Sequence, residues 1–168
     1  TEYTAVSTPI QHAAVAGFEI SKDMDEYFEI IRNIHHIMGE YTHNALVEID
    51  GVKATKPDAT FYLLADFNSF ATDLQKVKIS TSQKLSESLM VHPYHTAIVG
   101  GDSLVLERTD FSARIAYVDY DGASVYQNFK DKKPKTHSER TEFVVNNAPK
   151  TVGGIKMIAK FFEDIRNQ

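Results

Sequence analysis

Arg114 is the residue of this sequence whose position most favours a chemical role. It is the second residue of the segment 113–119 (ARIAYVD), which is otherwise apolar and typical of a β-strand. A guanidinium stays charged at physiological pH, so burying it without a partner is costly. Two interpretations follow. Either Arg114 lies at an edge or pairs with an internal carboxylate, or it presents its planar fork to both oxygens of a ligand carboxylate.

The other residues that suggest chemistry give weaker signals. His35 and His36 are adjacent in a helical pattern and point to different sides, whereas His92 and His95 flank a proline. We therefore predict no metal site, because the chain has neither cysteine nor an HExxH motif. Lys84 follows a serine-rich stretch that faintly resembles those before Schiff-base lysines. The favoured interpretation is a helix cap, with Lys84 facing solvent.

Two further segments have structural interpretations. Gly100 and Gly101 end an apolar segment and are typical of a turn at a strand end. A phosphate-binding loop is also compatible with paired glycines, but no GxGxxG or Walker pattern is present. The segment 130–140 (KDKKPKTHSER) mixes basic and acidic residues without an aromatic residue, so we predict a solvated connector.

The composition excludes several classes of function. The chain has 168 residues, no cysteine, and a net charge of −5. This length predicts one domain with a sizeable core, and the lack of cysteine excludes disulfides, iron–sulfur clusters and a thiol nucleophile. Net acidity argues against nucleic-acid binding, and no apolar run approaches the ~20 residues that span a membrane. We expect a cytoplasmic, soluble domain, and the start at Thr1 suggests a piece of a longer protein.

The elements that must position these residues follow from periodicity. Thr8 and Pro9 begin a helix with Thr8 as its cap, and apolar residues three and four apart predict a long helix over 24–41 that ends near Gly39. Strands are predicted at 45–49, 60–67, 95–99 and 113–119, and further helices at 80–91, 122–129, 142–147 and from a Thr151 cap to residue 165.

This order of elements predicts an α/β (α+β-like) fold. The expected architecture is a small, mostly antiparallel sheet, covered by helices on one face and preceded by the long helix. From the residues alone, the prediction ends at a soluble α/β domain with Arg114 as its candidate carboxylate ligand.

Five segments in order carry a family resemblance. They are 8–14 (TPIQHAA), the long helix 24–41, 57–63 (PDATFYL), 99–104 (VGGDSL) and 113–119 (ARIAYVD). They resemble, in turn, the helix after the cofactor-lysine region, the interdomain helix, the Pro-x-Gly-x-Phe-Tyr strand, the Val-Pro-Gly-x-x-Phe turn and the arginine-bearing strand of one enzyme group. That group is the fold-type-I, pyridoxal-phosphate-dependent aminotransferases of class I/II, which are aspartate aminotransferase-like.

The resemblance implies a helical segment over 1–44, including the interdomain helix, and an aminotransferase C-terminal small domain over 45–168. The parent enzyme would be a homodimer that transfers an amino group between amino-acid and 2-oxo-acid substrates. The family's cofactor lysine has no counterpart here, so pyridoxal phosphate would be bound by a missing large domain and the fragment would be inactive. Ala59, Gly100 and Leu104 stand where the family usually has Gly, Pro and Phe.

The family also suggests roles for single residues. Arg114 would clamp the substrate α-carboxylate, Gly101 would help to shape the site mouth, and Thr8 would lie near the cofactor phosphate of a neighbouring subunit. The resemblance implies no catalytic residue within this chain. Two alternatives stay open: the small domain of another fold-type-I enzyme, a lyase or synthase, and a stand-alone, non-catalytic binding module on this fold.

Overall fold

The structure is a computed structural model that describes residues 6–19 and 21–167. Within this part of the chain, seven α-helices accompany a four-stranded antiparallel sheet, so the predicted α/β class is confirmed. The elements are α1 (Thr8–Gly17), α2 (Lys22–Val47), β1 (Lys53–Ala54), β2 (Tyr62–Asp66), α3 (Ala71–Lys76), α4 (Ser82–Met90), β3 (Val99–Gly100), β4 (Ser112–Ala116), α5 (Gly122–Lys132), α6 (His137–Asn147) and α7 (Pro149–Arg166). None of the described helices combines the length and apolar character needed to cross a bilayer.

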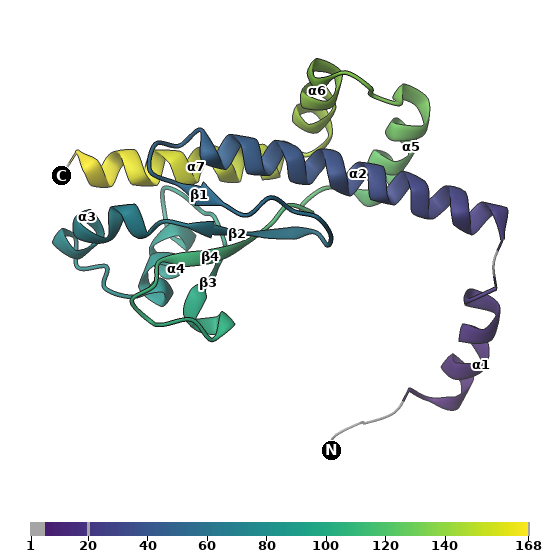
Figure 1. Cartoon of the computed structure of the whole chain (residues 1–168), viewed down its shortest axis with the longest axis horizontal. Coiled ribbons are helices and arrows are strands. Elements are labelled where there is room, and N and C mark those ends of the chain that lie inside the picture. The colour runs from purple at the N-terminus through teal and green to yellow at the C-terminus, as the bar shows by residue number, and fades with distance from the viewer. Residues whose placement is uncertain (1–5, 20, 168) are drawn as a thin grey trace.

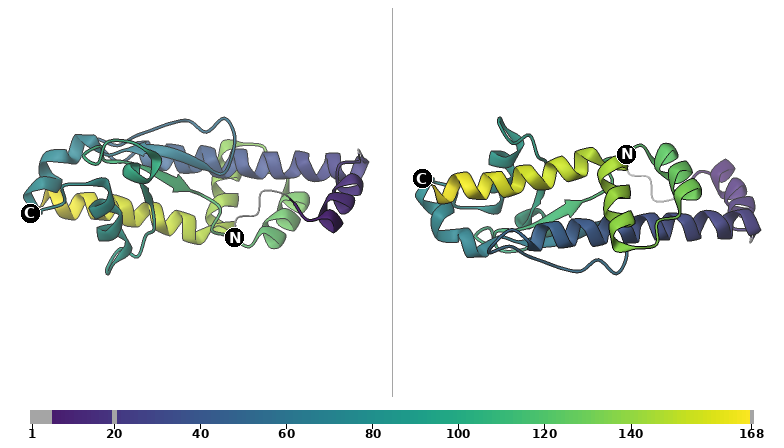
Figure 2. Two further views of the ribbon diagram at one scale, coloured as in Figure 1. Left: turned by 90° about the horizontal axis from the view of Figure 1, so that it is seen from below. Right: turned by 90° about the horizontal axis from the view of Figure 1, so that it is seen from above.

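The sheet has the order β1-β2-β4-β3, and each neighbouring pair is antiparallel. Side chains alternate between its faces, so that Leu63, Ala65, Ala113 and Ile115 are buried together. α2 and α7 lie along this buried face (Figure 1), and two further views show that the helices run side by side (Figure 2). They leave the opposite face, which carries Arg114, uncovered by either helix.

Two clusters of apolar side chains attach the helices to the sheet. In the larger cluster, the ring of Phe162 on α7 lies 4.8 Å from that of Phe67 and 4.2 Å from that of Phe70, between centroids. The smaller cluster joins α2 to α5 and α6 around the fully buried Met38. Aromatic pairs stabilise a core by about 0.5–1.5 kcal/mol beyond the area that they bury. α2 and α7 therefore pack against the sheet from one side.

α2 is longer than its sequence pattern predicts. The predicted end near Gly39 and the predicted strand at 45–49 are both wrong, because α2 continues to Val47. Met38, Thr42 and Leu46 recur at four-residue steps and are fully buried, so helical periodicity continues on one face. A short apolar run does not by itself separate a helix from a strand. The helix passes through the boundary predicted between residues 44 and 45.

Gly39 has a packing role in the middle of α2. A Cβ atom at this position would lie 2.8 Å from Cγ of Pro57 and 3.0 Å from Oη of Tyr117. Real Cβ atoms do not approach other atoms this closely, so the loop before β2 requires a glycine here. The residue that suggested a helix end therefore marks a close contact between α2 and that loop.

Two predictions in the C-terminal third are also wrong. Most of the predicted loop 130–140 is helical, because α5 extends to Lys132 and α6 begins at His137. Thr136 and Glu139 form a reciprocal capping box that starts α6. Thr151 lies inside α7, which begins at Pro149, and does not cap the helix.

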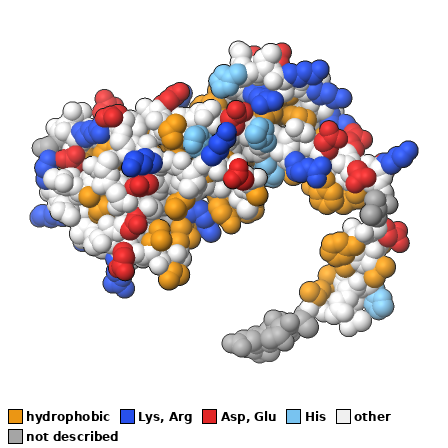
Figure 3. Space-filling view, viewed as in Figure 1, with side chains coloured by type: hydrophobic (Ala, Val, Ile, Leu, Met, Phe, Trp, Pro, Cys, Tyr) orange, Lys and Arg blue, Asp and Glu red, His pale blue; other side chains and the backbone are white. Residues whose placement is uncertain are grey.

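α1 projects from the end of α2 and has no buried residue (Figure 1). Apolar side chains gather on α1 and on the first turns of α2 (Figure 3). They are Ile10, Val15, Phe18, Tyr27 and Phe28, which are between 45% and 86% exposed. Exposed apolar groups of this kind on two neighbouring helices suggest a contact site for another domain or protein.

Candidate functional site

β4 places Arg114 in the middle of the sheet. Arg114 is paired with Leu64 of β2 on one side and with Val99 of β3 on the other. It is half-buried and lies on the face opposite Ala113 and Ile115. The interpretation of Arg114 as an edge residue is wrong, because a strand flanks β4 on both sides.

The guanidinium of Arg114 has no charged partner among the described residues. All six ion pairs in that part of the chain join other side chains. Its neighbour is instead the ring of Tyr62, whose centroid lies 5.0 Å from the guanidinium carbon. This cation–π contact holds the group in place without neutralising its charge. Arg114 is therefore half-buried, charged and free to bind an anion.

A hollow of about 320 Å³ lies beside Arg114. The other residues that line it are Thr55, Tyr62, Leu63, Leu64 and Leu104, although the side chain of Leu63 is buried on the opposite face of the sheet. The hollow is open to solvent, so water partly screens the attraction between the guanidinium and a carboxylate, and the paired hydrogen bonds of the guanidinium carry the recognition. The hollow and the charge together suit a small ligand with one carboxylate in contact with Arg114.

A tight 3₁₀ turn after β3, Gly101–Leu104, brings Leu104 to the rim of this hollow. A Cβ atom on Gly100 would lie 2.8 Å from the carbonyl oxygen of Ser82, and one on Gly101 would lie 3.0 Å from that of Ser112. Close packing of the turn therefore excludes a side chain at Gly100, and one at Gly101 would need its neighbours to shift slightly.

Val105 follows directly and combines backbone strain with exposure. It has φ 65° and is 96% exposed. This backbone region costs a β-branched residue on the order of 1–3 kcal/mol, and such strain clusters at binding sites. The turn around the hollow is thus a candidate binding surface.

Asp110 fixes the start of β4, and the sequence analysis missed this role. Its carboxylate accepts hydrogen bonds from Nδ2 of Asn68 at 3.0 Å, from the N–H of Ser112 at 2.9 Å and from Oγ of Ser112 at 2.6 Å. The bond from Asn68, followed by those from Ser112, lowers the pKa of Asp110 below its ordinary value. The network ties β4 to the end of β2. The Asp-x-Ser spacing at 110–112, typical of an Asx turn, is the signal that predicts it.

The structure places the other two predicted site residues away from the guanidinium. Gly101 is buried in the turn after β3 and does not line the hollow, although Leu104 of the same turn does. Thr8 is the exposed first residue of α1, and Ser7, not Thr8, is the residue that precedes the helix as its cap. α1 lies apart from the sheet in Figure 1, so this chain does not bring Thr8 to Arg114.

The remaining candidates have structural explanations. Oγ1 of Thr81 accepts a hydrogen bond from the N–H of Lys84 at 3.2 Å, so the predicted cap is confirmed and Lys84 is exposed. His35 is half-buried on α2, and burial lowers its pKa. The described residues contain no group of three or more His, Cys, Asp or Glu arranged to hold a metal ion.

The residues around Arg114 do not form a site for pyridoxal phosphate. Enzymes of this cofactor attach it to a lysine amine within the active site. No lysine lines the hollow beside Arg114, and Lys84 faces solvent on α4. This chain provides a guanidinium that can bind a carboxylate. The chemistry of the cofactor would require residues from another domain or chain.

Comparisons with known proteins add no identification. A scan against protein-family models found no match, and a search of curated proteins also found none.

Proposed function

We propose that this chain is the carboxylate-binding small domain of a pyridoxal-phosphate-dependent aminotransferase, with Arg114 as the clamp on the substrate α-carboxylate. The observation that carries the proposal is the half-buried guanidinium of Arg114, which lies on a central strand without a carboxylate partner among the described residues. Charged side chains are rarely buried unless paired, and unpaired ones favour a functional role. A planar carboxylate supplies the missing partner through two parallel hydrogen bonds.

In this proposal the chain contributes the orientation of the substrate. Two hydrogen bonds from one guanidinium fix the plane of a carboxylate, and hence the direction of the bonds at the adjoining carbon. Tyr62 restrains the guanidinium, and Leu64 and Leu104 line the hollow beside it. The reacting atoms of the substrate would then face away from the sheet, towards groups outside this chain.

The amino-transfer reaction itself is proposed for the parent protein on the basis of the segment resemblance. The parent would be a cytoplasmic homodimer that exchanges an amino group between an amino acid and a 2-oxo acid, with pyridoxal phosphate bound by another domain. The exposed apolar surface of α1 and the start of α2 supports this reading, because a second domain would cover it.

The carboxylate clamp can be tested on this chain by titrating it with pyruvate, the simplest 2-oxo acid, and recording NMR spectra of the arginine side-chain Nε–H groups. We expect a saturable shift at Arg114, and we expect Arg114→Gln to weaken binding by about tenfold or more, which is about 1.4 kcal/mol. Arg108→Gln removes an exposed guanidinium that does not line the hollow and should bind as the wild type does. Equal binding by Arg114→Gln and the wild type would refute the clamp.

The cofactor assignment has a separate test. Pyridoxal phosphate added to this chain should give no stable absorbance of a lysine-bound form, and a borohydride-trapped adduct at one specific lysine would overturn this expectation.

The coding sequence upstream of Thr1 should continue in frame through a Ser-x-x-Lys region followed by Gly-x-Arg. An initiating Met beside Thr1 would instead favour a stand-alone binding module. Product analysis of the parent separates a transaminase from a lyase or synthase.

A further inference from the structure

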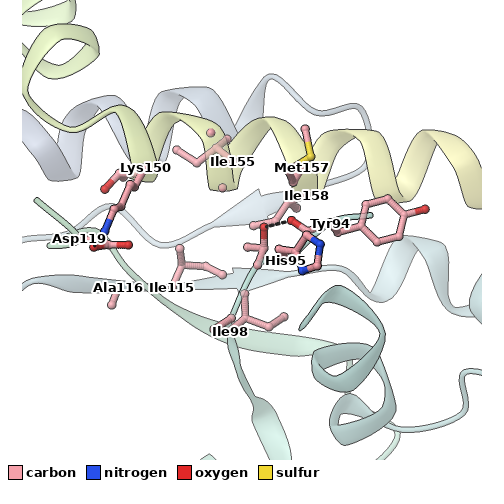
Figure 4. A pocket seen from close by; sticks show the side chains of 15 residues that line it. Tyr94, His95, Ile98, Ile115, Ala116, Asp119, Lys150, Ile155, Met157 and Ile158 are labelled. Carbon is pink, nitrogen blue, oxygen red and sulfur yellow. Dashed lines mark hydrogen bonds and ion pairs between the residues drawn. The ribbon is translucent and has the colours of Figure 1, made fainter. Parts of the chain in front are cut away.

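A second, larger cavity lies where α7 passes the end of β4 and the segment before β3 (Figure 4). Its volume is about 500 Å³, within the range of sites that bind ligands. Its walls are mainly apolar, from Ile98, Ile115, Ile155, Met157 and Ile158. Arg114 does not line it, and nothing in the proposed carboxylate site uses these residues.

The cavity opens where the β3–β4 ladder stops. The strand predicted over 95–99 forms only at Val99–Gly100. In an antiparallel sheet, successive residues direct their backbone N–H and C=O groups to opposite neighbours. The N–H of Tyr117 donates to Phe61 on the β2 side, so the backbone groups of Ala116 point to the β3 side.

Ala97 and Ala116 would be the next hydrogen-bonded pair of this ladder. They are not paired, and neither residue makes a backbone hydrogen bond outside the strand ladders in the described part of the chain. Both residues line the cavity. The backbone of Ala116 therefore offers one N–H and one C=O to an incoming strand, as an exposed sheet edge does.

α7 adds two features that packing does not explain. Thr151 is only 9% exposed and lines the cavity, and its Oγ1 has no hydrogen-bond partner among the described residues. Gly153 and Gly154 follow in the middle of the helix, where glycine costs about 1 kcal/mol relative to alanine. A Cβ atom on Gly153 would meet nothing within 4 Å, and one on Gly154 only Thr96, at 3.7 Å. The helix backbone thus lies open to the cavity.

The charges around the cavity define what fits inside it. Lys150 and Asp119 lie at its rim and form an ion pair of 3.2 Å between Nζ and Oδ1. These two charges pair with each other at the rim, and the walls are mainly apolar apart from Tyr94, His95 and Thr96, so we expect the group that enters to be uncharged and apolar. A ligand that uses the cavity and the free edge together needs an apolar side chain attached to a backbone amide.

We propose that an extended peptide segment binds here as an added strand on the edge of β4. Its backbone pairs with the N–H and C=O of Ala116, and a branched apolar side chain enters the cavity between Ile115 and Ile155. Main-chain hydrogen bonds supply affinity in this mode of recognition, and the side-chain pocket supplies specificity. The inference is independent of the carboxylate site at Arg114.

The first test compares two peptides on the wild-type chain. The probe is acetyl-Thr-Val-Ile-Val-Thr amide, and its control carries an N-methyl group on the central Ile, which removes one backbone donor but keeps every side chain. NMR titration should show saturable shifts at Ala97, Ala116 and Thr151. We expect the N-methylated peptide to bind about tenfold more weakly. Equal binding of the two peptides, or no shifts at these residues, would overturn the proposal.

The second test fills the cavity from the helix side. Gly153→Leu directs a side chain into open space, so the chain should keep its circular dichroism spectrum and lose affinity for the probe by about tenfold or more. Lys156→Leu places the same side chain on the exposed face of α7 and should leave binding unchanged. Shifts at Ala116 that depend on protein concentration without peptide would assign the edge to a second copy of this chain and would refute the peptide site.

Discussion

At Arg114, a full positive charge lies on a central strand with an aromatic ring as its neighbour. Its unusual setting is visible in the sequence, because an always-charged side chain interrupts an apolar strand. The surrounding geometry is not visible, because Tyr62, which contacts the guanidinium, and Leu104, which lines the same hollow, lie about 50 and 10 residues away in the chain. Sequence reasoning therefore identified the charged residue of the candidate site but neither its aromatic neighbour nor its apolar walls.

Asp110 is the residue whose ionisation should matter most to β4. Replacing it with Asn keeps a side-chain oxygen that can accept but removes the negative charge that strengthens its three hydrogen bonds, so we expect the free energy of unfolding at pH 7 to fall by about 1–2 kcal/mol in urea titrations. Its lowered pKa in the folded state stabilises the fold above the unfolded pKa of about 3.9, and this contribution is lost as pH falls through the folded pKa.

The difference in stability between wild type and Asp110→Asn should therefore shrink as pH falls below about 4. Asp58→Asn, at an exposed loop carboxylate, is the matched control and should change the free energy of unfolding little at any pH. A difference that stays constant down to pH 2 would show that the charge of Asp110 is not what stabilises this turn.

Among the elements, α2 and α6 show where local patterns mislead. Gly39 was predicted to end a helix, but its close contacts with Pro57 and Tyr117 explain the glycine. The apolar run at 45–49 was predicted to be a strand, but α2 continues to Val47. The segment 130–140 is rich in charged residues and was therefore predicted to be a loop. The signal for a helix start within it is limited to two residues, Thr136 and Glu139, which form the capping box of α6. Long periodic segments such as α7 were predictable, whereas contacts between elements were not.

Two glycines within helices should respond to substitution in opposite directions. Gly39→Ala forces a Cβ to within 3.0 Å of Pro57 and Tyr117, so we expect a loss of about 1–3 kcal/mol in the free energy of unfolding. Gly153→Ala places the same methyl group in open space and should gain about 1 kcal/mol from helix propensity alone. Urea unfolding of both variants measures the effect. Equal changes in the two variants would mean that helix propensity, not packing, determines the response at Gly39.

At the scale of the whole molecule, the chain has a well-packed body and an unpacked extension. The body is held by the two apolar clusters, which include α7 residues Phe161, Phe162 and Ile165. α1 has no buried residue and is too short to be a stable helix on its own in water. Its apolar side chains therefore contribute little to the stability of the body, and we expect them to serve contacts outside this chain.

Deletion of residues 1–20 tests this division. Because α1 buries nothing, the truncated chain should keep its free energy of unfolding within about 0.5 kcal/mol, the range for changes at an unconstrained surface. The loss of Ile10, Val15 and Phe18 should also lower the fluorescence of a dye that binds exposed apolar surface.

Removal of residues 158–168 is the control truncation at the other end of the chain. It takes away four side chains of the core, Ile158, Phe161, Phe162 and Ile165, and should abolish cooperative unfolding. If the N-terminal truncation destabilised the body as strongly, α1 would have to pack on the domain in solution. Its apolar side chains would then not be a surface for another partner.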